Sequence, residues 1–233
     1  MQPHFAIAPT VPAKAGWPSE RTAKNGSQAG LAAIDALGSV VLVARDKEIF
    51  AEGDTAEYCY KVIAGAVRTL KQMPDGRRQI SEFHMPGDLF GWEERDTHFL
   101  TAEAAADATL IRYPRKRIEA QASTDPALAR KLLEMALDSL RNCHKQMLLL
   151  GRKSAQERIA TFLLDMARRS RGDNDVIDLP MSRMDIADHL GLTLETVSRV
   201  LHRLHRDAAI KLASLHRVEL TDRAAIEDMD GEG

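Results

Sequence analysis

The sequence of 233 residues predicts an α+β protein in which a β roll or sandwich precedes a long helix and a C-terminal winged helix-turn-helix. Three observations predict this class. Short apolar runs separated by turn residues fill residues 40–113, an apolar heptad pattern follows residue 125, and two short helical patterns meet at HLGLT near residue 191. The predicted divisions are a flexible arm (1–30), the roll (31–125), the long helix (126–151) and the winged helix-turn-helix (152–233).

Composition excludes several classes of protein. The net charge is −2 and the pI is about 6.5, so any nucleic-acid surface must be local. Cys59 and Cys143 lie far apart without a CxxC motif, which argues against a disulfide framework and a cysteine-ligated metal site. No apolar run approaches the roughly 18 residues of a membrane span, and the N-terminus does not resemble a secretory signal. We therefore expect a cytoplasmic protein without a metal site.

Five runs in the first half of the chain have the β-branched, alternating texture of strands: VVLVA, YCYKVI, AVRTLKQ, RQISEFH and ATLIRY. The turn residues EGD, PDG and PGD separate them. Gly76 of PDG can adopt the positive φ that a tight hairpin requires. Closely spaced short strands predict a sandwich or roll and not a parallel sheet. A short helix is expected to lead into the first strand, within residues 31–39.

A long helix is predicted from residue 126 because Asp125 can cap it and Pro126 suits its first position. Apolar residues then recur at alternating intervals of four and three: Ala129, Leu133, Ala136, Leu140, Cys143, Met147 and Leu150. This heptad spacing is typical of a coiled-coil seam, so from Leu133 to Leu150 these residues are the predicted dimerisation contacts. The alternative is a helix that packs on its own domain. Gly151 is expected to end or bend the helix.

The segment 182–206 has the pattern of a helix-turn-helix. Ser182 and Asp185 can form a capping box, Gly191 occupies the turn, and Thr193 can cap the second helix. Apolar residues of the two helices are expected to face inward: Ile186, Ala187, Leu190, Val197 and Val200. The following run IKLASLHRVEL can form a hairpin, which would make the unit a winged helix.

In a helix-turn-helix the second helix enters the DNA major groove. Arg199 can donate to guanine O6 and N7, Glu195 can accept from cytosine N4, and Leu194 can contact a thymine methyl group. The predicted DNA-binding residues are Ser182, Thr193, Leu194, Glu195, Ser198, Arg199, His202 and Arg203. The alternative for Glu195 and Arg199 is a surface ion pair worth about 0.2–0.5 kcal/mol.

With these stretches in order, the chain resembles the Crp/Fnr family of bacterial transcription regulators over residues 35–220. The resemblance rests on EGD, IAGAVRTL, DGRRQI and PGDLFG in the roll, on the long helix, and on ETVSR at 195–199. It implies a jelly-roll-like β roll of the cyclic-nucleotide-binding type, a dimerisation helix and a winged helix-turn-helix. It also implies a homodimer that binds palindromic DNA, acts mainly as an activator and contacts RNA polymerase.

Departures from the family pattern favour one branch. Trp92 stands where cAMP-binding members carry Glu, and His98 and Phe99 stand where they carry Arg-Ser, so a cyclic nucleotide is not expected. The first 58 residues contain no cysteine, which excludes the iron–sulfur cluster of the Fnr branch. GDLFGWE, TAEA and LTLETVSR resemble the FixK-like branch, which acts without a known cofactor. That resemblance implies control of microaerobic, denitrification or nitrogen-fixation genes through a TTG…CAA palindrome.

Some residues keep two interpretations. An effector or haem in the roll, bound by His84 or His98, would make the protein a ligand-gated regulator; otherwise both are ordinary roll residues. Cys143 is a redox switch or a small seam hydrophobe, and Cys59 is a core thiol. Lys71, Arg77 and Arg78 flank a solvated turn or contact RNA polymerase. We expect the acidic tail after residue 223 to be disordered and, since no catalytic constellation is found, no enzymatic activity.

Overall fold

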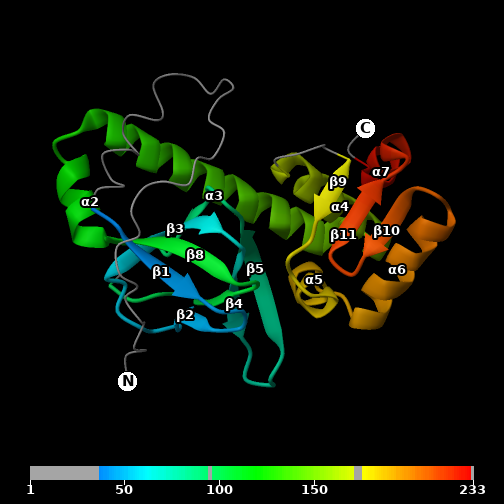
Figure 1. Cartoon of the computed structure of the whole chain (residues 1–233), viewed down its shortest axis with the longest axis horizontal. Coiled ribbons are helices and arrows are strands. Elements are labelled where there is room, and N and C mark those ends of the chain that lie inside the picture. The colour runs from blue at the N-terminus through cyan, green and yellow to red at the C-terminus, as the bar shows by residue number, and fades with distance from the viewer. Residues whose placement is uncertain (1–36, 94–95, 171–174, 232–233) are drawn as a thin grey trace.

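The structure is a computed structural model that describes residues 37–93, 96–170 and 175–231. The expected arm and most of the expected short helix before the first strand lie outside these ranges. The β roll occupies one end of the molecule and the winged helix-turn-helix the other, while helix α3 runs along both (Figure 1). No helix in the described ranges combines the length and the apolar character that crossing a membrane requires.

The roll consists of two antiparallel four-stranded sheets with strand orders β1-β8-β3-β6 and β2-β7-β4-β5. The first sheet contains β1 (Ser39–Val43), β8 (Ala108–Pro114), β3 (Tyr58–Ala64) and β6 (Leu89–Phe90). The second contains β2 (Glu48–Phe50), β7 (Thr101–Ala104), β4 (Val67–Gln72) and β5 (Arg78–His84). All five predicted strands are present. The three strands that were not predicted are only two to four residues long, too short to show alternation.

Helices cover one end of the roll through a small apolar cluster. Cys59, Tyr113, Ile118 and Leu128 are buried together and join β3 and β8 to helices α2 (Arg115–Ala122) and α3 (Pro126–Arg152). Cys59 is therefore a core residue, as expected, and burial raises the pKa of its thiol to about 12. It stays protonated and unreactive at neutral pH.

Helix α3 begins as the sequence predicts and ends slightly later. The Asp125 carboxylate accepts hydrogen bonds from the backbone N–H groups of Ala127 and Leu128, and Pro126 occupies the first turn. The helix continues through Gly151 and ends at Arg152, where the next residue becomes extended. Helix α2 was not predicted.

The C-terminal unit contains a three-stranded sheet and four helices. Its helices are α4 (Ala155–Arg169), α5 (Arg183–Leu190), α6 (Leu194–Arg206) and α7 (Arg223–Asp230). Its strands, in the order β10-β11-β9, are β9 (Val176–Asp178), β10 (Ile210–Ser214) and β11 (Arg217–Leu220). The predicted wing is therefore present. All five residues expected to face inward in the helix-turn-helix are buried.

The tail forms a helix, so the expected disorder is wrong for its described part. Asp222 caps α7 by accepting a hydrogen bond from Ala225, and Ile226 is fully buried against the C-terminal core. The Asp230 carboxylate accepts a hydrogen bond from Lys153 Nζ at 2.8 Å, close to the junction of α3 and α4. One cap and one apolar anchor outweigh the acidic composition on which the expectation rested.

Arg158 of α4 ties the end of α3 to the helix-turn-helix. Its guanidinium donates to the carbonyl oxygens of Leu150 (2.9 Å), Lys153 (2.8 Å) and Leu190 (2.8 Å). The first two acceptors lie at the C-terminal end of α3 and the third at the end of α5. These charge-assisted bonds satisfy helix-terminal carbonyls and fix the two helices relative to each other.

His189 gives the fold a measurable pH dependence. Its ring lies near Phe83 and Phe162, its Nδ1 hydrogen-bonds the Ile80 carbonyl, and burial lowers its pKa from 6.5 to about 4. Between these two pH values the unfolded chain binds a proton that the folded chain does not. Stability contributed by neutral His189 is therefore complete above pH 6.5 and declines as the pH falls toward 4.

We expect the difference in unfolding free energy between wild type and His189→Gln to shrink by about 2 kcal/mol from pH 7 to pH 4.5. The measurement is urea denaturation of both proteins at each pH. Other buried histidines, such as His84, are present in both proteins, so their contribution to the pH dependence of the unfolding free energy cancels in the comparison. A difference that stays constant over this range would show that His189 does not titrate as its burial implies.

Candidate DNA interface

The first helix of the helix-turn-helix is held by a capping box. Ser182 Oγ accepts a hydrogen bond from the Asp185 backbone N–H at 3.1 Å, and Asp185 Oδ2 accepts one from the Ser182 N–H at 2.9 Å. Gly191 then turns the chain with φ 62° and ψ 40°, a left-handed conformation that favours glycine. A Cβ there would lie 3.3 Å from Leu150 Cδ2, so the turn also packs tightly against α3.

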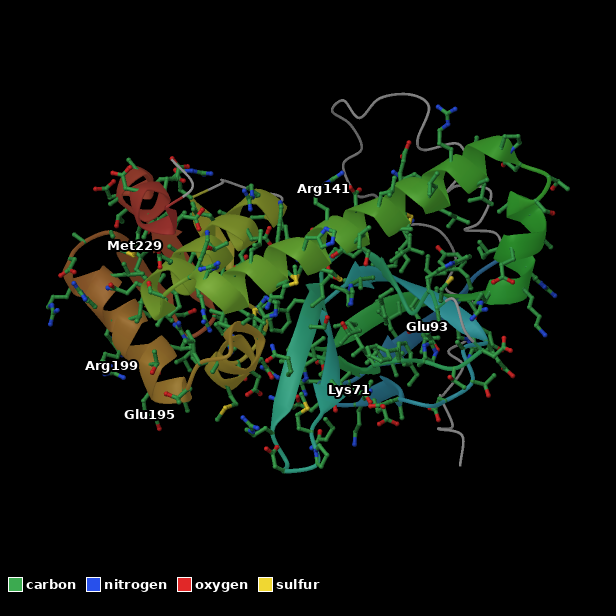
Figure 2. All side chains as sticks on the ribbon, turned by 180° about the vertical axis from the view of Figure 1, so that it is seen from behind. Lys71, Glu93, Arg141, Glu195, Arg199 and Met229 are labelled. Atoms are coloured by element: carbon green, nitrogen blue, oxygen red, sulfur yellow. The ribbon has the colours of Figure 1, made fainter. Side chains whose placement is uncertain are left out.

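The second helix, α6, presents one apolar and one polar face. Thr193 caps it by accepting a hydrogen bond from the Thr196 N–H at 3.2 Å. Its buried residues are Val197, Val200, Leu201 and Leu204. Its outer face is formed by Leu194, Glu195, Arg199, His202 and Arg203, which are exposed, and Ser198, which is half-buried. Figure 2 shows Glu195 and Arg199 on the side of α6 that points away from the rest of the molecule. Seven of the eight predicted DNA-binding residues thus lie on α6 or its cap, and Ser182 lies at the start of α5.

The charged groups of this face are available to a ligand. Hydrogen bonds from its own backbone N–H and from Thr193 lower the pKa of Glu195, and the charge of Arg199 adds to the effect. Glu195 is therefore ionised at neutral pH. Arg199 Nη2 donates to Thr196 Oγ1 at 3.4 Å, and within the described ranges no ion pair joins it to Glu195. Arg203 is partly neutralised, because its Nε lies 3.6 Å from Asp207.

Arg183 is a further candidate that was not among the predicted DNA-binding residues. It occupies the first position of α5, where the helix dipole disfavours a cation. Its guanidinium is partly buried, which lowers its pKa, and its buried Nη1 has no hydrogen-bond partner among the described residues. Because Nη1 is shielded from solvent, a phosphate near the start of α5 would meet the accessible remainder of this half-buried side chain. The available signal was a basic residue in the first turn of a helix.

The wing lies beside α6 and carries mixed charges. Lys211 of β10 pairs with Glu219 of β11 at 3.3 Å, and Arg217 lies 4.0 Å from Asp178. Leu215 at its tip is highly exposed. The charges of Lys211 and Arg217 are thus partly neutralised by neighbouring carboxylates.

The predicted dimerisation residues divide into two groups. Leu133, Ala136, Leu140, Cys143 and Met147 are exposed along α3, and the three large side chains among them are 52–64% exposed. Leu150 is partly buried and packs against the C-terminal core of its own chain. The exposed stripe is therefore available to a partner from Leu133 to Met147, whereas Leu150 belongs mainly to the junction with the helix-turn-helix.

Aromatic rings pack on one another in the interior of the roll. Phe50, Tyr60 and Phe90 pack ring against ring, with centroids 5.3–6.2 Å apart. His98 stacks on Phe50 at 3.6 Å, and Phe99 points outward and is largely exposed. These two residues occupy the positions where the resemblance places the phosphate-binding Arg-Ser, and neither supplies a permanent positive charge.

The two roll histidines are core residues. His84 is buried, its Nε2 lies 3.2 Å from Thr69 Oγ1, and its ring stacks on Phe90. Desolvation lowers the pKa of His84, so the ring is neutral at pH 7. Its Nε2 is thus already hydrogen-bonded, which argues against haem ligation through that atom. The described part of the chain brings together no group of three or more His, Cys, Asp or Glu side chains that could hold a metal ion.

Comparison with known proteins identifies the family. A model of the Crp-like helix-turn-helix domain matches residues 157–229, and one of the cyclic nucleotide-binding domain matches residues 40–125. The nitrogen fixation regulation protein FixK of Azorhizobium caulinodans is 46% identical over 201 residues, which cover 84% of this chain and 81% of that protein. This chain belongs to the Crp/Fnr family. Its members are DNA-binding transcription regulators, and this chain is therefore a regulator and not an enzyme.

Two further relatives give the same assignment. FixK of Rhizobium meliloti is 39% identical, with coverage of 78% of this chain and 83% of that protein. The solved structure of FixK2 from Bradyrhizobium japonicum superposes with a TM-score of 0.81 at 44% identity, covering 84% of this chain and 98% of that one. The predicted fold, a β roll of the cyclic-nucleotide-binding type followed by a C-terminal helix-turn-helix, is confirmed.

We expect Arg199→Ala to reduce affinity for the specific site by about 1–3 kcal/mol, because the variant lacks both donors to one guanine. Affinity for unrelated duplex should change far less. Fluorescence anisotropy with specific and scrambled duplexes measures both. Arg203→Ala is the matched control, since removing a cation from the same helix should weaken attraction to the phosphates and so reduce affinity for both duplexes equally. The same pattern of weakening in the two variants would contradict a base contact by Arg199.

Proposed function

We propose that this protein is a homodimeric transcription activator that binds a palindrome of the TTG…CAA type without a bound effector. The observation that carries the proposal is the outer face of α6, where an ionised carboxylate and a guanidinium lie one helical turn apart and are not paired with each other. Hydrogen-bonding groups of opposite kind on an exposed recognition helix suit the edges of a guanine–cytosine pair.

The proposed contacts follow from the positions of the side chains. Arg199 donates to guanine, Glu195 accepts from cytosine, and Leu194 packs on a thymine methyl group, with Ser198 beside them. Phosphate contacts come from groups at the edges of this face: Arg183, Thr193, His202 and Arg203. Ser182 contributes by capping α5, because its hydroxyl and its N–H already donate to Asp185. Phosphates fix the register of the helix in the groove, and base edges supply the specificity.

Dimerisation is proposed from the exposed stripe of α3. Leu133, Leu140 and Met147 are large apolar side chains that a monomer would leave in water. Pairing two α3 helices would cover them and place two copies of α6 about 34 Å apart, which matches one turn of DNA. Cys143 then lies in this seam as a small apolar residue.

Independence from an effector is proposed from the interior of the roll. Its aromatic rings pack on one another, and the two positions that would bind a nucleotide phosphate carry His98 and Phe99. The buried, hydrogen-bonded His84 likewise disfavours the alternative of a haem-gated regulator. A Soret band in the purified protein, or a melting temperature raised by cAMP, would restore the ligand-gated alternative.

The regulated genes are proposed from the relatives. Proteins named for nitrogen fixation regulation are 38–46% identical to this chain, so we infer control of nitrogen-fixation or microaerobic and anaerobic genes. RNA polymerase is the proposed protein partner of an activator working on bacterial DNA in the cytoplasm.

Selection from random duplexes, in air and without added ligand, tests the proposal. Wild type should enrich a palindrome with two TTG-like half-sites. Leu140→Asp places a charge on the exposed stripe, so we expect a folded monomer by light scattering and at least a tenfold loss of affinity for the palindrome. Arg141→Ala, also exposed on α3 but outside the heptad positions, should remain dimeric. A wild-type monomer, or binding that requires an added ligand, would contradict the proposal.

A further inference from the structure

Four charged residues join the roll to the helix-turn-helix. Arg68 of β4 and Arg78 of β5 contact Asp185 and Asp188 of α5, and we call this group the interdomain ion-pair cluster. Arg68 Nη1 lies 3.2 Å from Asp185 Oδ1, Arg78 Nη2 lies 2.6 Å from the same oxygen, and Arg78 Nε lies 2.6 Å from Asp188 Oδ2. One carboxylate of α5 thus bridges two strands of the roll.

The centre of the cluster is removed from solvent. Arg68 is 5% exposed and Asp185 is 1% exposed. Burial by itself would lower the pKa of Arg68, but the hydrogen bond with Glu103 and the charges of Asp185 and Glu103 more than offset it and raise the pKa. Arg68 Nη2 also contacts Asp46 at 3.0 Å. The roll therefore holds this guanidinium rigidly before it meets α5.

Asp185 connects the cluster to the start of the helix-turn-helix. Its Oδ2 accepts the capping hydrogen bonds from the Ser182 N–H and hydroxyl, while its Oδ1 accepts from Arg68 and Arg78. The same carboxylate thus fixes the first turn of α5 and its position on the roll. Charge-assisted bonds of this kind are short and directional, and they are strong where water is excluded.

The other end of α5 is also fixed. The His189 carbonyl accepts hydrogen bonds from Gln79 of β5 (3.1 Å) and Gln146 of α3 (2.8 Å), and His189 Nδ1 bonds the Ile80 carbonyl. The opposite face of α5 buries Ile186, Ala187 and Leu190 in the core shared with α4 and α6. Helix α5 is therefore attached to the roll at both ends and to α6 along its other face. As a result, α6 cannot rotate independently of the roll.

We propose that Arg78 and Asp188, together with Arg68 and Asp185, are positioning residues that set the distance and angle between the two recognition helices of the dimer. They touch no base; they act on α6 through α5. The cluster thereby fixes the orientation of the helix-turn-helix relative to the roll through contacts within one chain. This inference rests on the proposed function, because it requires a dimer on a palindrome.

The spacing between half-sites provides the test. Each added or removed base pair moves one half-site by about 3.4 Å and rotates it by roughly 35°. Affinities are measured for the selected palindrome, for versions one base pair longer and shorter, and for a scrambled duplex. Wild type should prefer the selected spacing by about tenfold or more. Arg78→Ala and Asp188→Ala should reduce that preference to about threefold or less and leave scrambled-duplex affinity unchanged.

Two controls separate positioning from stability. Arg77→Ala removes the neighbouring arginine, whose side chain is 83% exposed and pairs with Asp75 inside its own hairpin, and should keep the wild-type preference. Arg78→Lys keeps the charge without the planar fork that reaches two carboxylates, and should be intermediate. If Arg78→Ala does not fold, the spacing preference is measured on Asp188→Ala alone. The Asp188 side chain is partly exposed, and its removal leaves the contacts to Asp185 intact.

The outcomes are distinct. Variants that melt at a lower temperature but retain the wild-type spacing preference would overturn the inference, because the cluster would then only stabilise the fold. A wild-type protein that is monomeric, or that binds all spacings and scrambled DNA alike, would instead overturn the proposed function. A flattened preference in both alanine variants, with dimerisation and scrambled-duplex affinity preserved, would support both.

Discussion

The buried carboxylate of Asp185 is the constraint on which the arrangement of this molecule depends. A charge that is 1% exposed is tolerated because two guanidinium groups and a helix cap surround it. Its partners come from strands more than a hundred positions earlier in the chain, so they can meet it only when roll and helix-turn-helix are docked in one way. Apolar packing alone would tolerate sliding at such a junction, whereas directional bonds to one oxygen do not.

In the proposed function, the roll of this family member serves as a scaffold. Aromatic rings occupy its interior, and cationic residues of β4 and β5 are directed at α5. The same fold that matches a cyclic nucleotide-binding domain is therefore compatible with a different task, because the task depends on the site and not on the fold. Helix α3 contacts both parts of the molecule. Its Leu128 packs with Cys59 of β3 in the cluster at the roll, and its Leu149 packs in the core of the helix-turn-helix.

Local signals in the sequence predicted most of the fold and much of the candidate site. Strands with clear alternation, the Asp125–Pro126 helix start, the Ser182–Asp185 capping box and the polar face of α6 all follow rules that span a few residues. What escaped prediction depends on distant partners. Arg78 was predicted to flank a solvated turn, but β5 packs beside α5 and Arg78 pairs with Asp188. The acidic tail was predicted to be disordered, but Ile226 is buried in the core. Strands of two to four residues carry too little pattern to be recognised at all.

Gly191 has a consequence for building hybrid regulators from this chain. A Cβ added at its left-handed turn would lie 3.3 Å from Leu150 Cδ2, so the helix-turn-helix packs closely against the end of α3. Grafting the C-terminal half onto another protein's long helix would bring a different side chain against that turn. A bulkier one would collide with it, and a smaller one would leave a void beneath it. A functional chimera would need to carry the last turn of α3 along with the part that binds DNA.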